Sequence, residues 1–116
     1  MSITITRSMH GLDTEDMSQE FGLEPRRYDY TVTASGGGKV KVRIEHRTPD
    51  IPGIGSENVR GKWKTLVDKF DTDSGQTTSG HFTLPSFPTH PLTKMRVHFS
   101  RSIGSKGVDY VYHQEP

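Results

Sequence analysis

The sequence has no cysteine among its 116 residues. Disulfide frameworks and thiolate metal sites are therefore excluded. Long apolar runs are also missing, since no stretch approaches the ~20 residues of a membrane-spanning helix. The first residues already alternate between polar and apolar side chains, which a secretory leader does not do. We therefore expect a cytosolic protein with no membrane partner.

Large apolar side chains are scarce. Leu, Ile, Val and Phe together account for 24 of the 116 residues, and the net charge is only +1. This apolar fraction lies just above the range of chains that stay disordered through high charge and low hydrophobicity. The composition predicts a single domain with a thin core, which a partner subunit would complete.

Motifs for chemistry are few. The six histidines are scattered without a zinc-site spacing. Asp71, Asp73 and Gly75 begin like a calcium loop, but the third ligand and the distant glutamate are missing. The sequence contains no nucleophile motif and no phosphate-binding glycine loop before a helix. We expect no metal, no cofactor and no enzymatic activity.

Two alternating segments flank the glycines at 36–38. Residues 27–34 place Tyr28, Tyr30 and Val32 on one side, and residues 39–47 do the same with Val40 and Val42. Successive strand side chains point to opposite faces, so the pattern predicts two half-buried strands joined by a glycine turn. The polar sides of these strands hold the cations Lys39, Lys41 and Arg43.

A third alternating segment, residues 58–70, has Trp63 and Val67 on one side and Lys62 and Lys64 on the other. If it neighbours residues 39–47, one sheet face gathers cations and hydroxyls able to bind RNA phosphates. The same cations can equally serve only to keep a sheet soluble. The predicted RNA-binding residues are Arg27, Thr31, Thr33, Lys39, Lys41, Arg43, Lys62 and Lys64.

Residues 92–103 fit two periods. Met95, Val97 and Phe99 alternate as in a strand, whereas Leu92, Met95, Phe99 and Ile103 lie on one face of a helix. Pro91 near the start and Gly104 past the end favour the helix. The predicted fold is therefore α+β, an antiparallel sheet with a C-terminal helix.

The whole chain is expected to form one domain. Residues 1–25 form an N-terminal hairpin or strand plus a short acidic segment, in which Asp13 and Gly22 mark the ends of a candidate short helix. Residues 26–85 form the antiparallel sheet, residues 89–104 the helix, and residues 105–116 a tail or short strand.

This order of elements resembles the coat proteins of single-stranded RNA bacteriophages, the levivirus-like family. The resemblance covers residues 27–103. It lies in the strand Lys41 to His46, a glycine-containing loop, the run Arg60 to Phe70, the turn Asp71 to Gly75, a strand ending in proline and a following helix.

The resemblance implies a structural capsid protein. Its sheet would be completed by an intertwined homodimer. The partner's helix would pack on the apolar side of the sheet, formed by Tyr28, Tyr30, Val40, Val42, Ile44, Trp63 and Val67. Such dimers assemble into an icosahedral shell that packages single-stranded RNA, in a virion built in the bacterial cytoplasm.

A different interpretation is a non-enzymatic β-sandwich that binds a carbohydrate or a protein. In that case residues 94–100 form a strand, and Trp63, Tyr110 or Tyr112 contributes to the site, although core packing explains the two tyrosines better. The secondary structure near residues 92–103 distinguishes the two interpretations.

Overall fold

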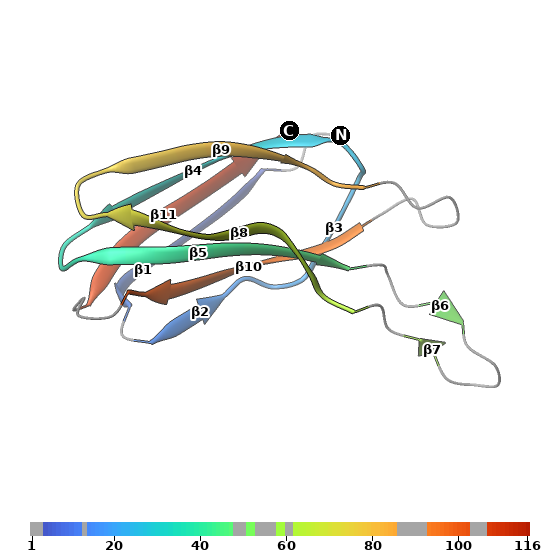
Figure 1. The fold of residues 1–116 in the computed structure, drawn as a ribbon, viewed down its shortest axis with the longest axis horizontal. Helices are drawn as coiled ribbons and strands as arrows, with labels where there is room; N and C mark the ends of the chain where they lie inside the picture. Colours follow the sequence, from blue (N-terminus) through green and yellow to red (C-terminus); the bar gives the residue numbers. More distant parts are fainter. Residues whose placement is uncertain are drawn as a thin grey trace.

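The computed structural model describes residues 4–12, 14–47, 51–52, 58–59, 62–85, 93–102 and 107–116. Within these ranges the chain forms antiparallel strands and no helix. The predicted α+β fold with a C-terminal helix is therefore wrong. The chain folds as two sheets, one above the other in Figure 1.

The first sheet has the strand order β1-β11-β4-β9, and the second has the order β2-β10-β5-β8, with β3 also paired to β10. A short ladder, β6-β7, projects at one end of the sandwich (Figure 1). The strands are β1 (Ile5–Leu12), β2 (Glu15–Met17), β3 (Phe21–Leu23), β4 (Arg27–Ser35), β5 (Lys39–Arg47), β6 (Ile51–Pro52), β7 (Asn58–Val59), β8 (Lys64–Asp73), β9 (Thr77–Thr83), β10 (Thr93–Arg101) and β11 (Val108–Glu115).

Strand β10 occupies the segment in which a helix was predicted. Met95, Val97 and Phe99 are fully buried and face the first sheet. The strand pairs with β5 on one side and with β2 and β3 on the other. Leu92 and Ile103, which completed the helical period, lie outside the described residues. The period of two prevails because a strand paired along both edges satisfies its backbone while burying every second side chain.

Strands β4 and β5 do not form the predicted hairpin. Both strands exist, but β4 lies in the first sheet and β5 in the second. The glycine segment carries the chain from one layer to the other, and Gly36 adopts a φ of 88°, which favours glycine.

Aromatic rings fill the space between the layers. Phe99 of β10 stacks on Tyr110 of β11 with ring centroids 4.3 Å apart, and Tyr30 stacks on Phe70 at 5.6 Å. Tyr30 also lies against Gly80 of β9, where a Cβ would come within 2.4 Å of the tyrosine hydroxyl oxygen. Any larger residue at position 80 would displace this ring.

The first and the last strand, β1 and β11, belong to the first sheet. β11 lies between β1 and β4, so the predicted C-terminal tail is a central strand. Tyr110 and Tyr112 on β11 are buried, which confirms the expectation that they pack in the core. The expected N-terminal strand corresponds to β1. The described part of residues 11–22 holds the end of β1, then β2 and the start of β3, and contains no helix.

One charged cluster joins the sheets where β1 faces β2. Asp16 of β2 is buried and accepts hydrogen bonds from Arg7 of β1 and from the hydroxyl of Tyr110. The Arg7 Nε to Asp16 Oδ2 distance is 2.8 Å. These bonds, chiefly the one from Arg7, lower the pKa of Asp16, whereas burial and the Asp16 carboxylate raise the pKa of Tyr110.

Candidate anion-binding site

The outer face of the second sheet carries rows of polar residues set by the pairing of β5 with β10. Lys41 lies opposite Ser100, Arg43 opposite His98, and Glu45 opposite Arg96. The side chains between them, such as Val42 and Val97, face the core and are fully buried. The alternation that builds the core therefore also fixes these polar groups side by side.

Strand β8 adds Lys69 to this face through a bulge. Val67 lies opposite Ile44 and Phe70 opposite Val42, so three steps along β8 match two along β5. The extra residue reverses the alternation, because a bulge re-aims the side chains that follow it. Alternation in the sequence from Trp63 through Val67 predicts that Lys69 lies on the apolar side. In the structure, the bulge places it on the polar face.

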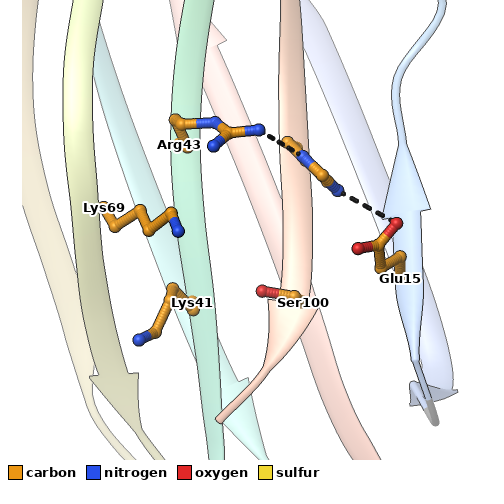
Figure 2. Close-up of a pocket in the computed structure, with 6 residues that line it drawn as sticks. Glu15, Lys41, Arg43, Lys69 and Ser100 are labelled. Atoms are coloured by element: carbon orange, nitrogen blue, oxygen red, sulfur yellow. Dashed lines mark hydrogen bonds and ion pairs between the residues drawn. The ribbon is translucent and has the colours of Figure 1, made fainter. Parts of the chain in front are cut away.

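These residues surround a cavity of about 170 Å³. Figure 2 shows Lys41 and Arg43 of β5, Lys69 of β8 and Ser100 of β10 around one space above the sheet, with Glu15 of β2 beyond β10. His98 completes the lining. The lining holds three permanent cations and one carboxylate, so the cavity has a positive balance.

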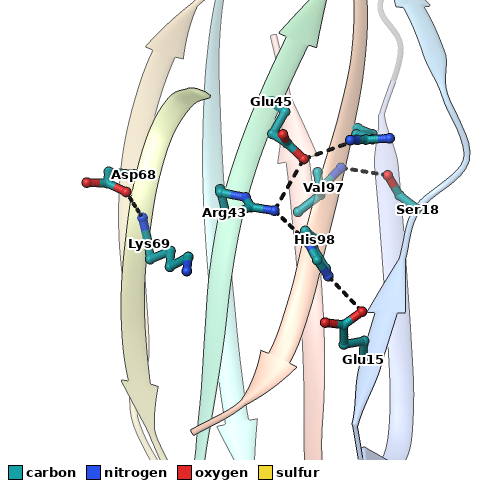
Figure 3. Close-up of polar contacts among 9 residues, drawn as sticks. Glu15, Ser18, Arg43, Glu45, Asp68, Lys69, Val97 and His98 are labelled. Atoms are coloured by element: carbon teal, nitrogen blue, oxygen red, sulfur yellow. Dashed lines mark hydrogen bonds and ion pairs between the residues drawn. The ribbon is translucent and has the colours of Figure 1, made fainter. Parts of the chain in front are cut away.

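A line of polar contacts crosses the three strands beside the cavity (Figure 3). Arg43 donates to His98 Nδ1 at 2.9 Å, and its guanidinium lies 3.7 Å from Glu45 Oε1. The other ring nitrogen of His98, Nε2, lies 3.4 Å from Glu15 Oε2. Although Glu15 Oε2 is this near, Nε2 is buried and makes no hydrogen bond to a described residue.

The cations of this face differ in how fully they are neutralised. Lys39 lies 3.4 Å from Asp73, while Lys41 reaches Asp71 only at 4.0 Å. Within the described part of the chain, Lys69 has no ion pair, since its hydrogen bond to Asp68 is made by the backbone N–H. Arg43 Nε is buried and has no hydrogen-bond partner among these residues. Among the described residues, the cavity lining therefore includes one lysine without an ion pair and one arginine with an unused buried donor.

Trp63 lies further along the same face. Arg96 and Arg47 place their guanidinium carbons 4.0 and 5.2 Å from the centre of its ring. Arg96 also bonds Glu45 at 3.1 Å, which connects the ring to the contacts of Arg43. Trp63 was predicted to face the core, but it is half-buried against cations.

The structure divides the predicted RNA-binding residues between two faces. Arg27, Thr31 and Thr33 lie on β4 and are exposed on the first sheet, away from the cavity. Lys39, Lys41 and Arg43 share the outer face of the second sheet. Sequence reasoning missed Glu15, Lys69, His98 and Ser100. Only His98 and Ser100 had a signal in the sequence, because the alternating pattern of a strand includes them, but the helix was preferred there.

The remaining two predicted residues, Lys62 and Lys64, are exposed at the start of β8. Lys62 precedes the strand, and Lys64 pairs with His46, at the end of the sheet remote from the cavity. Burial, with a smaller contribution from the Lys64 cation, lowers the pKa of His46. The predicted neighbourhood of β5 and β8 is nevertheless confirmed.

Among the residues that the structure describes, no three His, Asp or Glu side chains are grouped to hold a metal ion. The same residues include no helix with the length and apolarity needed to span a membrane.

The strand order defines the class of fold. If β2 and β3 are counted as one strand, each of the two sheets has four strands. Their order is that of an eight-stranded jelly roll. Ser18 joins β2 to β3, since its N–H and its hydroxyl bond the backbone of Val97. Jelly rolls occur in viral capsid and lectin domains, among others.

Neither the models of known protein families nor the curated proteins include a match to this sequence. Solved structures do match. A chain of the T13 particle of infectious bursal disease virus aligns with a TM-score of 0.52 at 12% identity, over 99% of this chain and 30% of that chain. The Gt strain of that virus gives 0.47 at 11% identity, over 98% and 32% of the two chains.

Bacillus endospore appendages, described as disulfide-linked pili, align with a TM-score of 0.46 at 10% identity, over 98% of this chain and 85% of that chain. This protein thus spans about a third of the length of the viral chains it matches. At 12% identity the likeness to the T13 particle chain shows a shared fold.

Proposed function

We propose that this protein is a capsid-type structural subunit, which associates with copies of itself into a shell and holds single-stranded RNA on the outer face of its second sheet. The jelly-roll strand order is the observation that carries the proposal. We assign it no catalytic step and no cofactor, and as a shell subunit it would be a component of a virion.

One sheet edge favours self-association. The other edge strands are irregular or short. The pairing of β8 has register shifts, that of β1 is irregular between Met9 and Leu12, and β2 and β3 have three residues each. Bulges and short strands protect edges against further pairing. By contrast, β9 has seven residues with regular pairing to β4 and no Lys or Pro, and no described strand pairs with its outer edge.

The basic face supports the RNA part of the proposal. Lys39, Lys41, Arg43 and Lys69 lie on neighbouring strands, and Trp63 adds an aromatic ring. Cations that follow a phosphate backbone, together with a ring that stacks on bases, are how proteins bind single strands without sequence preference.

Replacing Lys41 and Arg43 with Ala should weaken binding of single-stranded RNA and leave assembly intact. Each lost phosphate contact removes about 0.7 from the slope of log affinity against log salt, so the pair should lower the slope by roughly 1.4. Fluorescence anisotropy of a labelled oligouridine across a salt series measures this. The matched control replaces Arg26 and Arg27 with Ala, two exposed cations just before and at the first residue of β4 in the other sheet. Equal losses in both variants would contradict binding at this face.

A second candidate function is a sandwich module that binds a carbohydrate. The strand at 93–101 is the observation that favours it, because a strand there was the expected mark of this interpretation. Of its proposed site residues, Tyr110 and Tyr112 are buried and only Trp63 is accessible. A monomer without nucleic acid that binds a neutral oligosaccharide would favour this function over a shell subunit.

A further inference from the structure

We propose that the cavity between Lys41, Arg43, Lys69 and Ser100 is a binding site for one tetrahedral oxyanion, and that its natural occupant is a backbone phosphate of single-stranded RNA. The identity of the occupant rests on the proposed function. The site itself rests on the geometry of the sheet face alone.

The donors suit such a group. Two ammonium groups, a guanidinium and a hydroxyl come from three adjacent strands and surround one space (Figure 2). Phosphate and sulfate accept several charge-assisted hydrogen bonds at once, and lysine and arginine are their usual partners. A volume of about 170 Å³ admits a group of this size together with water.

The ion pairs of the site leave part of its positive charge without a close carboxylate among the described residues. Lys69 has no ion pair within the described ranges, and Lys41 has its carboxylate only at 4.0 Å. The buried Nε of Arg43 has no acceptor among the same residues. Like charges held together on a sheet oppose folding, and a bound anion would relieve that repulsion.

The contacts around Arg43 hold it in place for this role. Its terminal nitrogen is fixed by His98 and Glu45, so the guanidinium is ordered before any ligand arrives. Glu15 lies behind His98, with its Oε2 3.4 Å from the histidine Nε2. The single carboxylate of the lining is thus directed toward the histidine.

Trp63 favours RNA over a sulfated polysaccharide as the source of the anion. Arg47, which lies against the ring, is four residues from Arg43 along β5, a distance of ~13 Å. A single strand with a phosphate in the cavity can therefore bring a nearby base to Trp63 and to the Arg96 guanidinium that lies over its ring. Stacking of this kind contributes to binding of any base.

Lys69→Gln is the direct test, and Lys64→Gln is its control, because both remove one lysine from the exposed side chains of β8. The melting temperature of each protein is measured in a series of inorganic phosphate concentrations at constant ionic strength. We expect phosphate to stabilise the wild type and Lys64→Gln, with at least about tenfold weaker apparent affinity in Lys69→Gln. Equal stabilisation of all three proteins would overturn the site.

Binding of labelled oligouridine, with a sulfated oligosaccharide of equal charge as competitor, then identifies the source of the anion. We expect Lys69→Gln to lose affinity for oligouridine and Lys64→Gln to lose less. If Lys69→Gln weakens the stabilisation by phosphate but the wild type does not bind oligouridine, the RNA function is overturned and the anion site stands. Stronger binding of a sulfated oligosaccharide of equal charge would overturn RNA as the occupant.

Discussion

Replacing Asp16 with Asn should lower the free energy of unfolding by about 2 kcal/mol. Removing one member of a buried ion pair typically costs ~3–5 kcal/mol. The Asp16 side chain is 7% exposed, but that of Arg7 is 34% exposed, and water therefore screens part of the loss. Denaturation in urea measures the change, and the control is Asp29→Asn, which removes an exposed partner of Arg27 and should cost under about 0.5 kcal/mol.

The same cluster predicts a dependence on pH. Because the pKa of Asp16 is lowered in the folded state, its contribution is complete above the ordinary aspartate pKa of ~3.9 and is lost as the pH falls further. The stability of the wild type should therefore fall more steeply below about pH 4 than that of Asp16→Asn. Parallel pH profiles, or equal effects of Asp16→Asn and Asp29→Asn, would mean that the cluster does not hold the two sheets together.

Replacing Ser79 and His81 with Lys should abolish assembly while the subunit stays folded. Both residues are exposed on β9, the edge that the described residues leave unpaired and unprotected. If two copies pair antiparallel through β9 around Gly80, Ser79 of one copy lies opposite His81 of the other. Four lysines would then meet at the contact, and like charges opposite one another destabilise strand pairing.

The matched control replaces Ser8 and His10 with Lys on β1, the other edge of the same sheet. The amino-acid changes and the added charge are identical, so solubility effects cancel. Analytical ultracentrifugation measures particle size, and circular dichroism confirms the fold of each variant. Loss of assembly in both variants, or in neither, would rule out β9 as the interface.

The sequence predicted where strands lie far better than how they pair. Tyr28, Tyr30 and Val32 showed that β4 has one apolar face, and Val40 and Val42 showed the same for β5. A hairpin and a two-layer sandwich bury these faces equally well. The choice depends on distant partners, because β4 pairs with β11 and β5 pairs with β10.

The helix prediction failed because residues 92–103 satisfy two periods with shared residues. Met95 and Phe99 belong to both patterns, and only Val97 belongs to the strand alone. In the structure β5 and β2 supply hydrogen bonds to both edges of β10, which local propensity does not register.

The candidate site was partly predictable for a similar reason. Lys41 and Arg43 followed from simple alternation, since β5 is regular through them. Lys69 did not, because the bulge in β8 that turns it outward arises from pairing with β5 and leaves no mark in the spacing of β8 itself.

Light scattering with negative-stain microscopy on the protein expressed alone tests the central claim most directly, with the ultraviolet absorbance of the same peak to report nucleic acid. A capsid-type subunit with an RNA-binding face predicts uniform megadalton particles rich in nucleic acid. A 13.0 kDa monomer free of nucleic acid would contradict it.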